Sequence, residues 1–598
     1  QTLICDTLAM SGGWSPAIHL SCHTGAKPEW REDIAAFVPG LTVQKQWLAG
    51  SVKGDFRLAD CLSAGSEAGN ATAAFCGFTS ADAVPHQWQV DDWDDGPAMA
   101  YFHVPHTKAT SRAPKQFVDF QTDVTAAGIE MATREGYESI EHVKRYTAMG
   151  FGTDQGKTGN INGMAITARA LGKTIPETGT TIFRPNYTPV TFGAVVGRHS
   201  GQLFDPERYT ALHRWHLARE AVFEDVGLWK RPRYFPLAGE TMDEAVAREC
   251  LATRNGVGIL DASTLGKIDI QGNDAREFLG RVYTNAWAKL AVGKCRYGLM
   301  CGEDGMVFDD GVTACLADNH FAMTTTTGGA ARVLEWLEHY HQTEWPDMEV
   351  YFTSVTDHWA TITLSGPQSR ALLAEVSDGI DLSGDAFKYL DWRQGSVAGV
   401  PARVFRISFT GELSFEINVQ AHYAMHVWEA IFALGDRFGL TPYGTESMHV
   451  LRAEKGFIIT GQDTDGSVTP FDLGMGWCVS DAKPFSYIGK RGMARQDCIR
   501  TDRKQLVGLL TVDPNQVLQE GAQAVDDPEQ TIPMTQLGHV TSSYFSHCLQ
   551  RSIAMGFIRN GHARMGDIVY YPNLDGTATA AEICSPVFLD PEGARQHV

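Results

Sequence analysis

The segment over residues 305–312 places two adjacent carboxylates in a run of strand-forming residues that follows a turn. Side chains along a strand alternate between its two faces, so Asp309 and Asp310 are not expected to point into the same pocket. One of the two acids is therefore a candidate site residue. The alternative is that both lie at the solvated end of a strand.

Further motifs surround this acidic pair in a fixed order along the chain. They occupy residues 253–263, 266–275, 297–300, 364–368, 409–416, 452–456, 461–463 and 538–543. Together they resemble the aminomethyltransferase family, which comprises the folate-binding T-protein of glycine cleavage and its relatives. The resemblance extends from about Leu212 to the C-terminus. It implies a folate-binding domain over residues 211–500 and a closing β-barrel over residues 501–598.

The residues before Leu212 resemble the alpha subunits of heterotetrameric sarcosine oxidases and not a free-standing T-protein. Residues 5–16 are predicted to form a buried strand that ends in a glycine turn at Gly12 and Gly13. Gly50 and Gly54 precede a helical segment over residues 58–65 and resemble the second glycine-rich turn of a dinucleotide-binding domain. Glycine there would let backbone amides approach a phosphate, although a tight turn alone explains the same pattern. Residues 1–111 are therefore expected to be the C-terminal part of a disulfide-reductase-like dinucleotide-binding domain.

The other half of such a nucleotide site is missing from the sequence. A G-x-G-x-x-G turn directly after the first strand holds the pyrophosphate in this fold, and no such turn precedes Cys5. Because the chain begins with Gln1, we expect a processed or fragmentary subunit or one piece of a split one. NAD is implied with a partial site only. Ser51 stands where flavoprotein relatives often have Asp, which argues against a flavin in this domain.

Residues 112–210 are expected to form a connector domain of the sarcosine oxidase alpha type. No cysteine lies between Cys76 and Cys250, so a thiolate-bound iron–sulfur cluster is excluded here. The motif that contains Thr153, Gln155 and Lys157 is not a P-loop, because its two glycines are too close together. The resemblance implies that these three residues line an FMN at the interface with a beta subunit. A structural network of turns is the alternative.

Bulk properties indicate a large enzyme subunit that binds neither nucleic acid nor membranes. A length of 598 residues predicts three or four domains, which we expect to be of mixed α/β and α+β class. The net charge of −21 disfavours nucleic acid and anionic membranes, and no apolar run approaches the roughly 20 residues that span a bilayer. The cysteines are scattered and the histidines do not cluster, so no metal site is predicted. Free thiols indicate a reducing cytoplasm.

The resemblance also implies which residues form the site. A carboxylate near the reacting folate nitrogens can exchange protons and stabilise a cationic iminium. The family pattern places this role at Asp310, with Asp309 as the open alternative. Glu416 is expected to accept hydrogen bonds from the donor edge of the pterin and to face away from its apolar neighbours. The alternative is that Glu416 is an exposed residue on an alternating strand. The remaining folate contacts, carried over by position, are Tyr297, Thr326, Phe409, Leu265 and Glu446.

Three of these positions depart from the relatives. Phe409 stands where many relatives have Tyr, so stacking is kept while a hydroxyl is lost, and Leu265 replaces a Met. Glu446 stands where T-proteins of glycine cleavage have an Arg. This reversal of charge disfavours transfer from a lipoyl-bound aminomethyl group. It suits an enzyme that receives a free iminium or formaldehyde.

We therefore expect an oxidoreductase subunit of a sarcosine oxidase-like complex. The complex would demethylate sarcosine to glycine and pass the one-carbon unit to tetrahydrofolate, giving 5,10-methylenetetrahydrofolate. The implied cofactors are tetrahydrofolate, NAD, FMN at the interface with a beta subunit and FAD on a partner subunit. The implied partners are beta, gamma and delta subunits. Two alternatives stay open: a subunit of an N-methylglutamate dehydrogenase-type enzyme, and a non-catalytic folate-binding scaffold.

Overall fold

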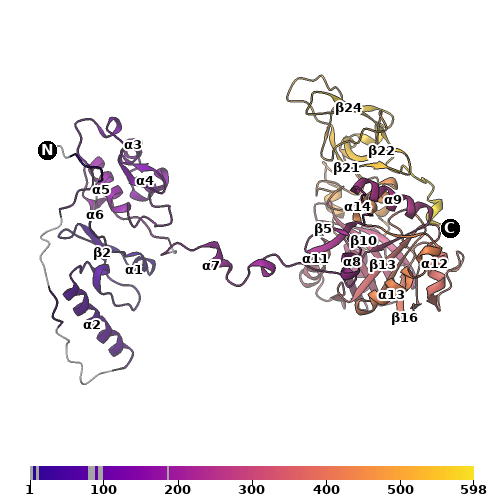
Figure 1. Ribbon diagram of the computed structural model, residues 1–598, viewed down its shortest axis with the longest axis horizontal. Coiled ribbons are helices and arrows are strands. Elements are labelled where there is room, and N and C mark those ends of the chain that lie inside the picture. Colours follow the sequence, from indigo (N-terminus) through magenta and orange to yellow (C-terminus); the bar gives the residue numbers. More distant parts are fainter. Residues whose placement is uncertain (1–3, 8–11, 79–87, 92–98, 185–186) are drawn as a thin grey trace. The chain divides into compact units, whose positions relative to one another are not determined.

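The chain divides into two compact units, residues 1–204 and residues 205–598 (Figure 1). The computed structural model describes residues 4–7, 12–78, 88–91, 99–184 and 187–598. The finer division at residues 111 and 500 stays a prediction.

The smaller unit is built around three packed helices. Its elements are α1 (His19–His23), β1 (Pro28–Arg31), β2 (Ala36–Pro39), α2 (Leu58–Phe75), β3 (Phe117–Asp119), β4 (Val124–Thr125), α3 (Ala126–Arg134), α4 (Ile140–Thr147), α5 (Asn160–Leu171), α6 (Ile175–Thr178) and α7 (Phe192–Val196). Ile129 of α3, Val143 of α4 and Met164 of α5 lie buried in one cluster. Gly163 permits this packing, because a Cβ there would lie 2.0 Å from the Sδ of Met149.

The N-terminal segment differs from its prediction. Cys5 and Asp6 are exposed and belong to no strand, and Gly12 and Gly13 are also exposed; residues 8–11 lie outside the described residues. The expected buried strand is therefore wrong for the described part of the segment. The nearby strands β1 and β2 pair with each other in a two-stranded sheet that the described part of the segment does not join. The helix expected over residues 58–65 is confirmed, and α2 continues it to Phe75.

The larger unit begins with a helix and a hairpin, followed by two largely antiparallel sheets with covering helices and by the C-terminal sheet. The opening elements are α8 (His213–Ala218), β5 (Val222–Val226), β6 (Trp229–Tyr234) and α9 (Met242–Asn255). The first sheet has the order β12-β8-β11-β10-β9. It comprises β8 (Gly266–Gln271), β9 (Cys295–Cys301), β10 (Val307–Ala317), β11 (His320–Thr325) and β12 (Tyr351–Ser354), and it packs with α10 (Ala275–Val282) and α11 (Ala330–Thr343).

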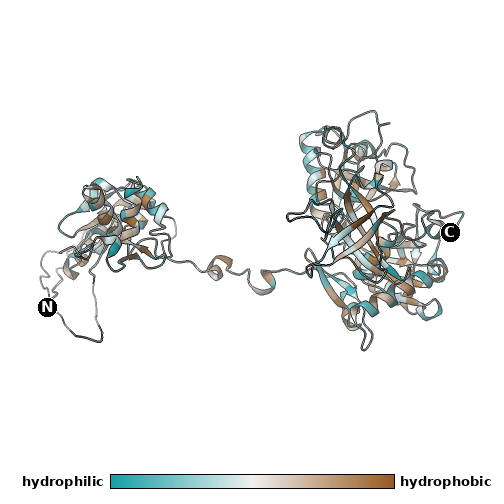
Figure 2. Ribbon diagram, turned by 90° about the horizontal axis from the view of Figure 1, so that it is seen from above, coloured by the Kyte–Doolittle hydropathy of each residue, from teal (hydrophilic) through white to brown (hydrophobic). Residues whose placement is uncertain are grey.

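The second sheet has the order β14-β15-β16-β17-β13-β7-β18, and only its pair β18–β7 is parallel. Its strands are β7 (Val257–Asp261), β13 (Trp359–Ser365), β14 (Ser377–Asp378), β15 (Trp392–Val397), β16 (Val400–Phe405), β17 (Ser414–Gln420) and β18 (Leu440–Pro442), packed with α12 (Ser369–Val376) and α13 (Ala424–Phe432). Phe415 and Ile417 of β17 point into this core, whereas Glu416 is only partly buried. Strand alternation thus gives Glu416 the face that the sequence predicts. Figure 2 shows apolar residues concentrated on strands and more polar residues on outer helices and loops.

The C-terminal residues form a six-stranded antiparallel sheet of order β20-β21-β22-β19-β24-β23. Its strands are β19 (Lys504–Thr511), β20 (Gln523–Ala524), β21 (Gly538–Ser546), β22 (Arg551–Arg559), β23 (Ile568–Pro572) and β24 (Ala578–Cys584). Val525, directly after β20, bridges to Tyr570 of the opposite edge strand. This bridge brings the two edges together, so the sheet curls into the expected barrel.

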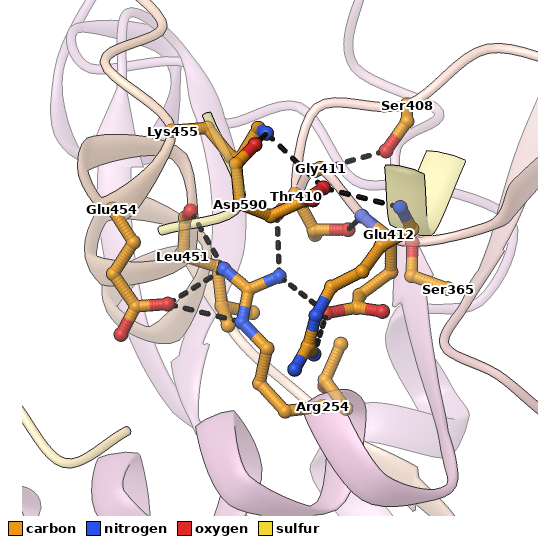
Figure 3. Close-up of polar contacts among 12 residues, drawn as sticks. Arg254, Ser365, Ser408, Thr410, Gly411, Glu412, Leu451, Glu454, Lys455 and Asp590 are labelled. Atoms are coloured by element: carbon orange, nitrogen blue, oxygen red, sulfur yellow. Dashed lines mark hydrogen bonds and ion pairs between the residues drawn. The ribbon is translucent and has the colours of Figure 1, made fainter. Parts of the chain in front are cut away.

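A buried arginine ties these parts together (Figure 3). Arg254 of α9 donates to the Glu454 carboxylate at 2.6 and 3.0 Å, to Glu412 at 2.8 Å, and to the carbonyl oxygens of Thr410 at 2.7 Å and Leu451 at 3.0 Å. Glu454 ends helix α14 (Thr445–Glu454). Its other carboxylate oxygen accepts a bond of 2.6 Å from Ser546 of the barrel.

A second buried ion pair lies two residues earlier on α14. Arg452 donates to Asp463 at 2.5 Å and to the hydroxyl of Ser542 at 2.6 Å. Asp463 also accepts bonds from the Thr541 and Ser542 hydroxyls at 2.5 and 2.8 Å. Helix α14 is thereby bonded at two points to β21 of the barrel.

Replacement of Arg254 by Met should cost about 3–5 kcal/mol of unfolding free energy, because it leaves the buried Glu454 carboxylate without a cation and leaves Glu412 with Arg595 alone. Denaturant unfolding of the purified chain measures this loss. Arg437→Met is the control: its ion pair with Glu375 is exposed, so it should cost less than about 1 kcal/mol. Equal losses in the two variants would contradict the role given to Arg254.

Candidate functional site

A cavity of about 1700 Å³ opens in the larger unit. It is lined by residues of both antiparallel sheets, of the β5–β6 hairpin, of α14 and of the segment that follows α14. The lining includes Asp309, Asp310 and Glu416, three acids that come from strands β10 and β17. Sequence segments far apart in the chain therefore meet at one site.

Asp310 is held by two hydroxyl groups. Its Oδ2 accepts a bond of 2.7 Å from the Tyr297 hydroxyl on β9, and its Oδ1 accepts one of 2.9 Å from Thr460. Burial raises the pKa of Asp310 above its ordinary value, against the opposing effect of these two bonds. Hydroxyl groups can rotate. Asp310 can therefore gain or lose a proton, or exchange a hydrogen-bond partner, without any change in the backbone.

Asp309 is held differently, mainly by backbone amides. Its Oδ1 accepts the N–H groups of Asp310 at 2.8 Å and Thr326 at 3.1 Å, and its Oδ2 accepts the Thr326 hydroxyl at 3.0 Å. Gly329 makes room for it, because a Cβ there would lie 1.6 Å from Oδ2. Burial raises the pKa of Asp309 to about 6. These contacts make Asp309 a fixed anchor for the turn at residues 326–329.

Both aspartates nevertheless line the same cavity, which corrects the expectation that only one of them would. The register of β10 against β9 shifts between Val307 and Asp309. This bulge lies before the pair, and Asp309 and Asp310 themselves face consecutive residues of β9. Both line the cavity because it extends to the turn at residues 326–329, where Asp309 is bonded. The two carboxylates still bond to different elements, Asp310 to β9 and the residue-460 segment, Asp309 to the turn after β11.

Glu416 is a carboxylate without a hydrogen-bond partner among the residues that the structure describes. Burial raises its pKa to about 7, and the positive charge of Lys267 opposes this shift. The Lys267 ammonium is itself buried, which lowers its pKa to about 8; it donates to the carbonyl oxygens of Ser263 at 2.9 Å and Leu265 at 3.1 Å. The acceptors of Glu416 are thus free for a ligand in the cavity.

Aromatic rings provide the flat walls. Phe409 stacks with Phe457 at a centroid distance of 6.3 Å and an interplanar angle of 21°, and Tyr297 lies 6.3 Å from Trp477 at 33°. Leu265 and Thr326 also line the cavity. Phe457 and Trp477 were not predicted from the sequence. Phe457 directly follows the motif at residues 452–456, and that position was its only signal.

Glu446 is the one predicted folate contact that does not line the cavity. Its carboxylate pairs with Arg233 of β6 at 2.9 Å. The side chain of Glu446 therefore does not face the cavity in this chain, because it pairs with the guanidinium of Arg233 on strand β6.

The candidate residues of the smaller unit lie in turns. Gly50 begins the 3-10 helix η1 (Gly50–Lys53) and Gly54 caps its end, and a Cβ at Gly54, whose φ is +85°, would lie 2.6 Å from Ile34. Turn geometry and packing account for this glycine. Gly12 and Gly13 have open space where a Cβ would be.

The three connector candidates share one turn and contact protein atoms. Thr153 accepts a bond of 3.0 Å from Gln121, and the Gln155 carbonyl lies 3.1 Å from His19. Lys157 donates to the carbonyl of Tyr187 and lies over its ring. The network of turns considered from the sequence is present, and the role of these residues toward FMN stays a prediction.

Within the described ranges, no helix combines the length and apolar character needed to cross a membrane.

Three protein families match parts of this chain. The GCVT N-terminal domain matches residues 212–483, the glycine cleavage T-protein C-terminal barrel domain matches residues 504–590, and the sarcosine oxidase A3 domain matches residues 113–198. An aminomethyltransferase from Streptomyces coelicolor is 31% identical over 361 residues, which cover 60% of this chain and 91% of that protein.

Solved structures support the fold of the same region. The glycine cleavage system aminomethyltransferase T from Bartonella henselae has a TM-score of 0.56 and 24% identity, and covers 64% of this chain and 98% of that one. This likeness shows the aminomethyltransferase-like fold.

The relatives with the greatest overlap extend the match to the whole chain. The sarcosine oxidase subunit alpha of Corynebacterium sp. strain P-1 is 48% identical over 602 residues, which cover 100% of this chain and 62% of that protein. This chain thus spans about three fifths of the length of the curated relatives it matches. It is similar over its whole length to sarcosine oxidase alpha subunits, and with its region from residue 212 onward it belongs to the aminomethyltransferase family.

Proposed function

We propose that this chain is the alpha subunit of a sarcosine oxidase-like complex and that its larger unit transfers a one-carbon unit to tetrahydrofolate. Sarcosine would be oxidised to glycine on a partner subunit, and 5,10-methylenetetrahydrofolate would form in the cavity of this chain. One observation carries the proposal: Glu416, a carboxylate without a hydrogen-bond partner among the described residues, and Asp310, a hydroxyl-bound carboxylate, line one large cavity with aromatic walls.

The cavity suits a folate in size and in chemistry. Ligand pockets commonly enclose about 300–1,000 Å³, so this larger cavity has room for a folate and for the one-carbon donor. Glu416 offers two free acceptors to the donor-rich edge of a pterin. The paired rings of Phe409 and Phe457 supply an aromatic surface against which a flat ring can stack.

The residues around Asp310 suit the proton transfers of the reaction. When formaldehyde condenses with tetrahydrofolate, two C–N bonds form, the C=O bond is lost, and water leaves with the carbonyl oxygen and two amine protons. Asp310 can accept an amine proton and return it to the departing oxygen, and its negative charge stabilises the cationic iminium in between. Its raised pKa brings it closer to the neutral range in which a general acid and base works best.

The oxidation step belongs to the rest of the proposed complex. We infer FAD on a partner subunit, FMN at the interface with a beta subunit beside Thr153, Gln155 and Lys157, and gamma and delta subunits as further partners, in a cytoplasmic enzyme. For NAD, the sequence implies a partial site only, and Gly54 of that site is packed against Ile34. No step is therefore assigned to NAD in this chain.

Asp310→Asn should lower formation of 5,10-methylenetetrahydrofolate by about a hundredfold or more, because the amide keeps the shape but loses the base and the charge. In the assembled complex, amine oxidation should continue and free formaldehyde should accumulate. Rapid-quench assays of 5,10-methylenetetrahydrofolate and of formaldehyde measure these two effects.

Asp318→Asn is the matched control, since Asp318 lies fully exposed on the turn after β10. This variant should change neither the rate of amine oxidation nor the rate of folate product formation. An unchanged folate product in Asp310→Asn, together with its loss in Asp309→Asn, would assign the chemistry to Asp309.

Glu416→Gln should weaken tetrahydrofolate binding by roughly 1.5–3 kcal/mol, the usual range for a hydrogen bond to a charged group. The wild-type affinity should also depend on pH. Because the pKa of Glu416 is raised to about 7, its carboxylate is mostly charged at pH 8 and mostly protonated at pH 6, so affinity should fall about tenfold between them. Titration calorimetry across this range should give a flat profile for Glu416→Gln. A sloping profile in the variant would rule out Glu416 as the titrating group.

A further inference from the structure

Arg231 is a buried cation on the wall of the same cavity. It lies in the middle of β6, between Trp229 and Tyr234, and its side chain lines the cavity near Glu224, Leu260 and His449. Only 8% of the residue is exposed. None of the motifs used above includes it.

The guanidinium of Arg231 makes no hydrogen bond or ion pair with any residue in the described part of the chain, and its Nε is buried without a partner. The other deeply buried arginines of this unit differ in this respect. Arg254 and Arg452 donate to carboxylates, and Arg406 donates to backbone carbonyls. A buried, unpaired cation is costly to the folded chain, so a protein that keeps one usually has a use for it.

The neighbouring charged groups do not neutralise Arg231. Glu224 and Asp261 are the carboxylates that affect it electrostatically, but neither forms an ion pair with it. Glu224 accepts the hydroxyl of Thr445, and Asp261 is bonded to His216 at 3.0 Å and to Thr210 at 2.6 Å. Asp261 is thus bonded to other donors, and Glu224, which lies opposite Arg231 in the β5–β6 pair, bonds to Thr445 in place of the guanidinium.

His449 lies beside Arg231 on the cavity wall and adds no charge. Burial, together with Arg452 and Arg231, lowers the pKa of His449 to about 4, so its imidazole is neutral at neutral pH. This corner of the cavity therefore presents the guanidinium N–H groups of Arg231 beside the Glu224 carboxylate, which faces Arg231 across the β5–β6 pair without bonding to it. An anion with a planar pair of oxygens matches such a guanidinium in charge and in geometry.

We propose that Arg231 binds the carboxylate of a reactant in the cavity. The inference rests on the proposed folate function, in which two reactants carry a carboxylate. One is the folate, with its glutamyl tail, and the other is an amino-acid-derived one-carbon donor. Arg231 would fix the position of that reactant and would not take part in the bond changes.

The first test compares unliganded proteins by thermal unfolding of the full chain. Arg231→Met removes a buried charge that lacks a partner, so its midpoint should equal or exceed that of the wild type. A structural role, in which Arg231 supports Glu224, gives the opposite result. A clear drop in the midpoint of Arg231→Met would overturn the proposal.

The second test distinguishes the two reactants by titration calorimetry with the full chain. The ligands are tetrahydrofolate, tetrahydropteroate, which lacks the glutamyl tail, and methoxyacetate with its uncharged analogue methoxyacetamide. If Arg231 holds the tail, Arg231→Met should weaken tetrahydrofolate at least tenfold and leave tetrahydropteroate unchanged. If it holds the donor, both folates should bind as before and the preference for methoxyacetate over methoxyacetamide should disappear.

A matched control is the adjacent residue Lys230. Its ammonium is engaged by Asp225 at 2.6 Å and Glu207 at 3.1 Å, and it does not line the cavity. Lys230→Met removes the same charge one residue away and should leave all four affinities unchanged. Equal effects of the two variants would mean a general electrostatic influence and would overturn the assignment, as would four unchanged affinities in Arg231→Met.

Failure of the proposed folate function has a different outcome. Wild-type protein that binds neither tetrahydrofolate nor tetrahydropteroate would contradict that function. The pair of methoxyacetate and methoxyacetamide would still decide whether Arg231 recognises a carboxylate.

Discussion

The buried charges at the end of α14 hold together the segments from which the cavity is made. Arg254 fixes the carbonyl of Thr410, next to Phe409, while Arg452 and Asp463 fix the segment that carries Thr460. Removing one partner of a buried ion pair costs far more than the net stabilisation by the pair, because the remaining buried charge is left without a partner. The walls of the cavity are therefore positioned by interactions that tolerate little change.

The same low-dielectric surroundings give the cavity its chemical character. Burial shifts the pKa values of Asp309, Glu416 and Lys267 toward neutrality, and groups with such shifts are concentrated at functional sites. The three acids differ in what holds them. Backbone amides immobilise Asp309, two hydroxyls hold Asp310, and Glu416 has acceptors to spare. These differences suggest an anchor, a proton carrier and a ligand contact.

Local patterns in the sequence predicted parts of this arrangement well. The alternation of Phe415, Glu416 and Ile417 gave the correct face of β17, because both apolar neighbours are drawn into one core. The same rule did not limit the cavity to one of Asp309 and Asp310, because the cavity extends to the turn at residues 326–329, which holds Asp309. The glycine turn at residues 12–13 suggested a buried strand, but the described residues of that segment pair with no strand and are mostly exposed.

Other parts of the site depend on contacts between distant segments. Glu446 was expected at the folate because of its position in a motif, yet Arg233, more than two hundred residues earlier, draws it away. Arg231 and His449 carry no motif, and their environment arises only when β6 packs beside α14. The sequence therefore predicts residues whose role is local to a strand, and misses those whose charge state is set by tertiary packing.

The closeness of the pKa values of Glu416 and Lys267, about 7 and about 8, has a thermodynamic consequence. Near neutral pH, Glu416 holds a proton in a large share of the unliganded molecules. A ligand that binds only the carboxylate form must expel that proton to solvent. Occupancy of the cavity is then linked to proton release, and the heat of association includes the ionisation enthalpy of whatever buffer accepts the proton.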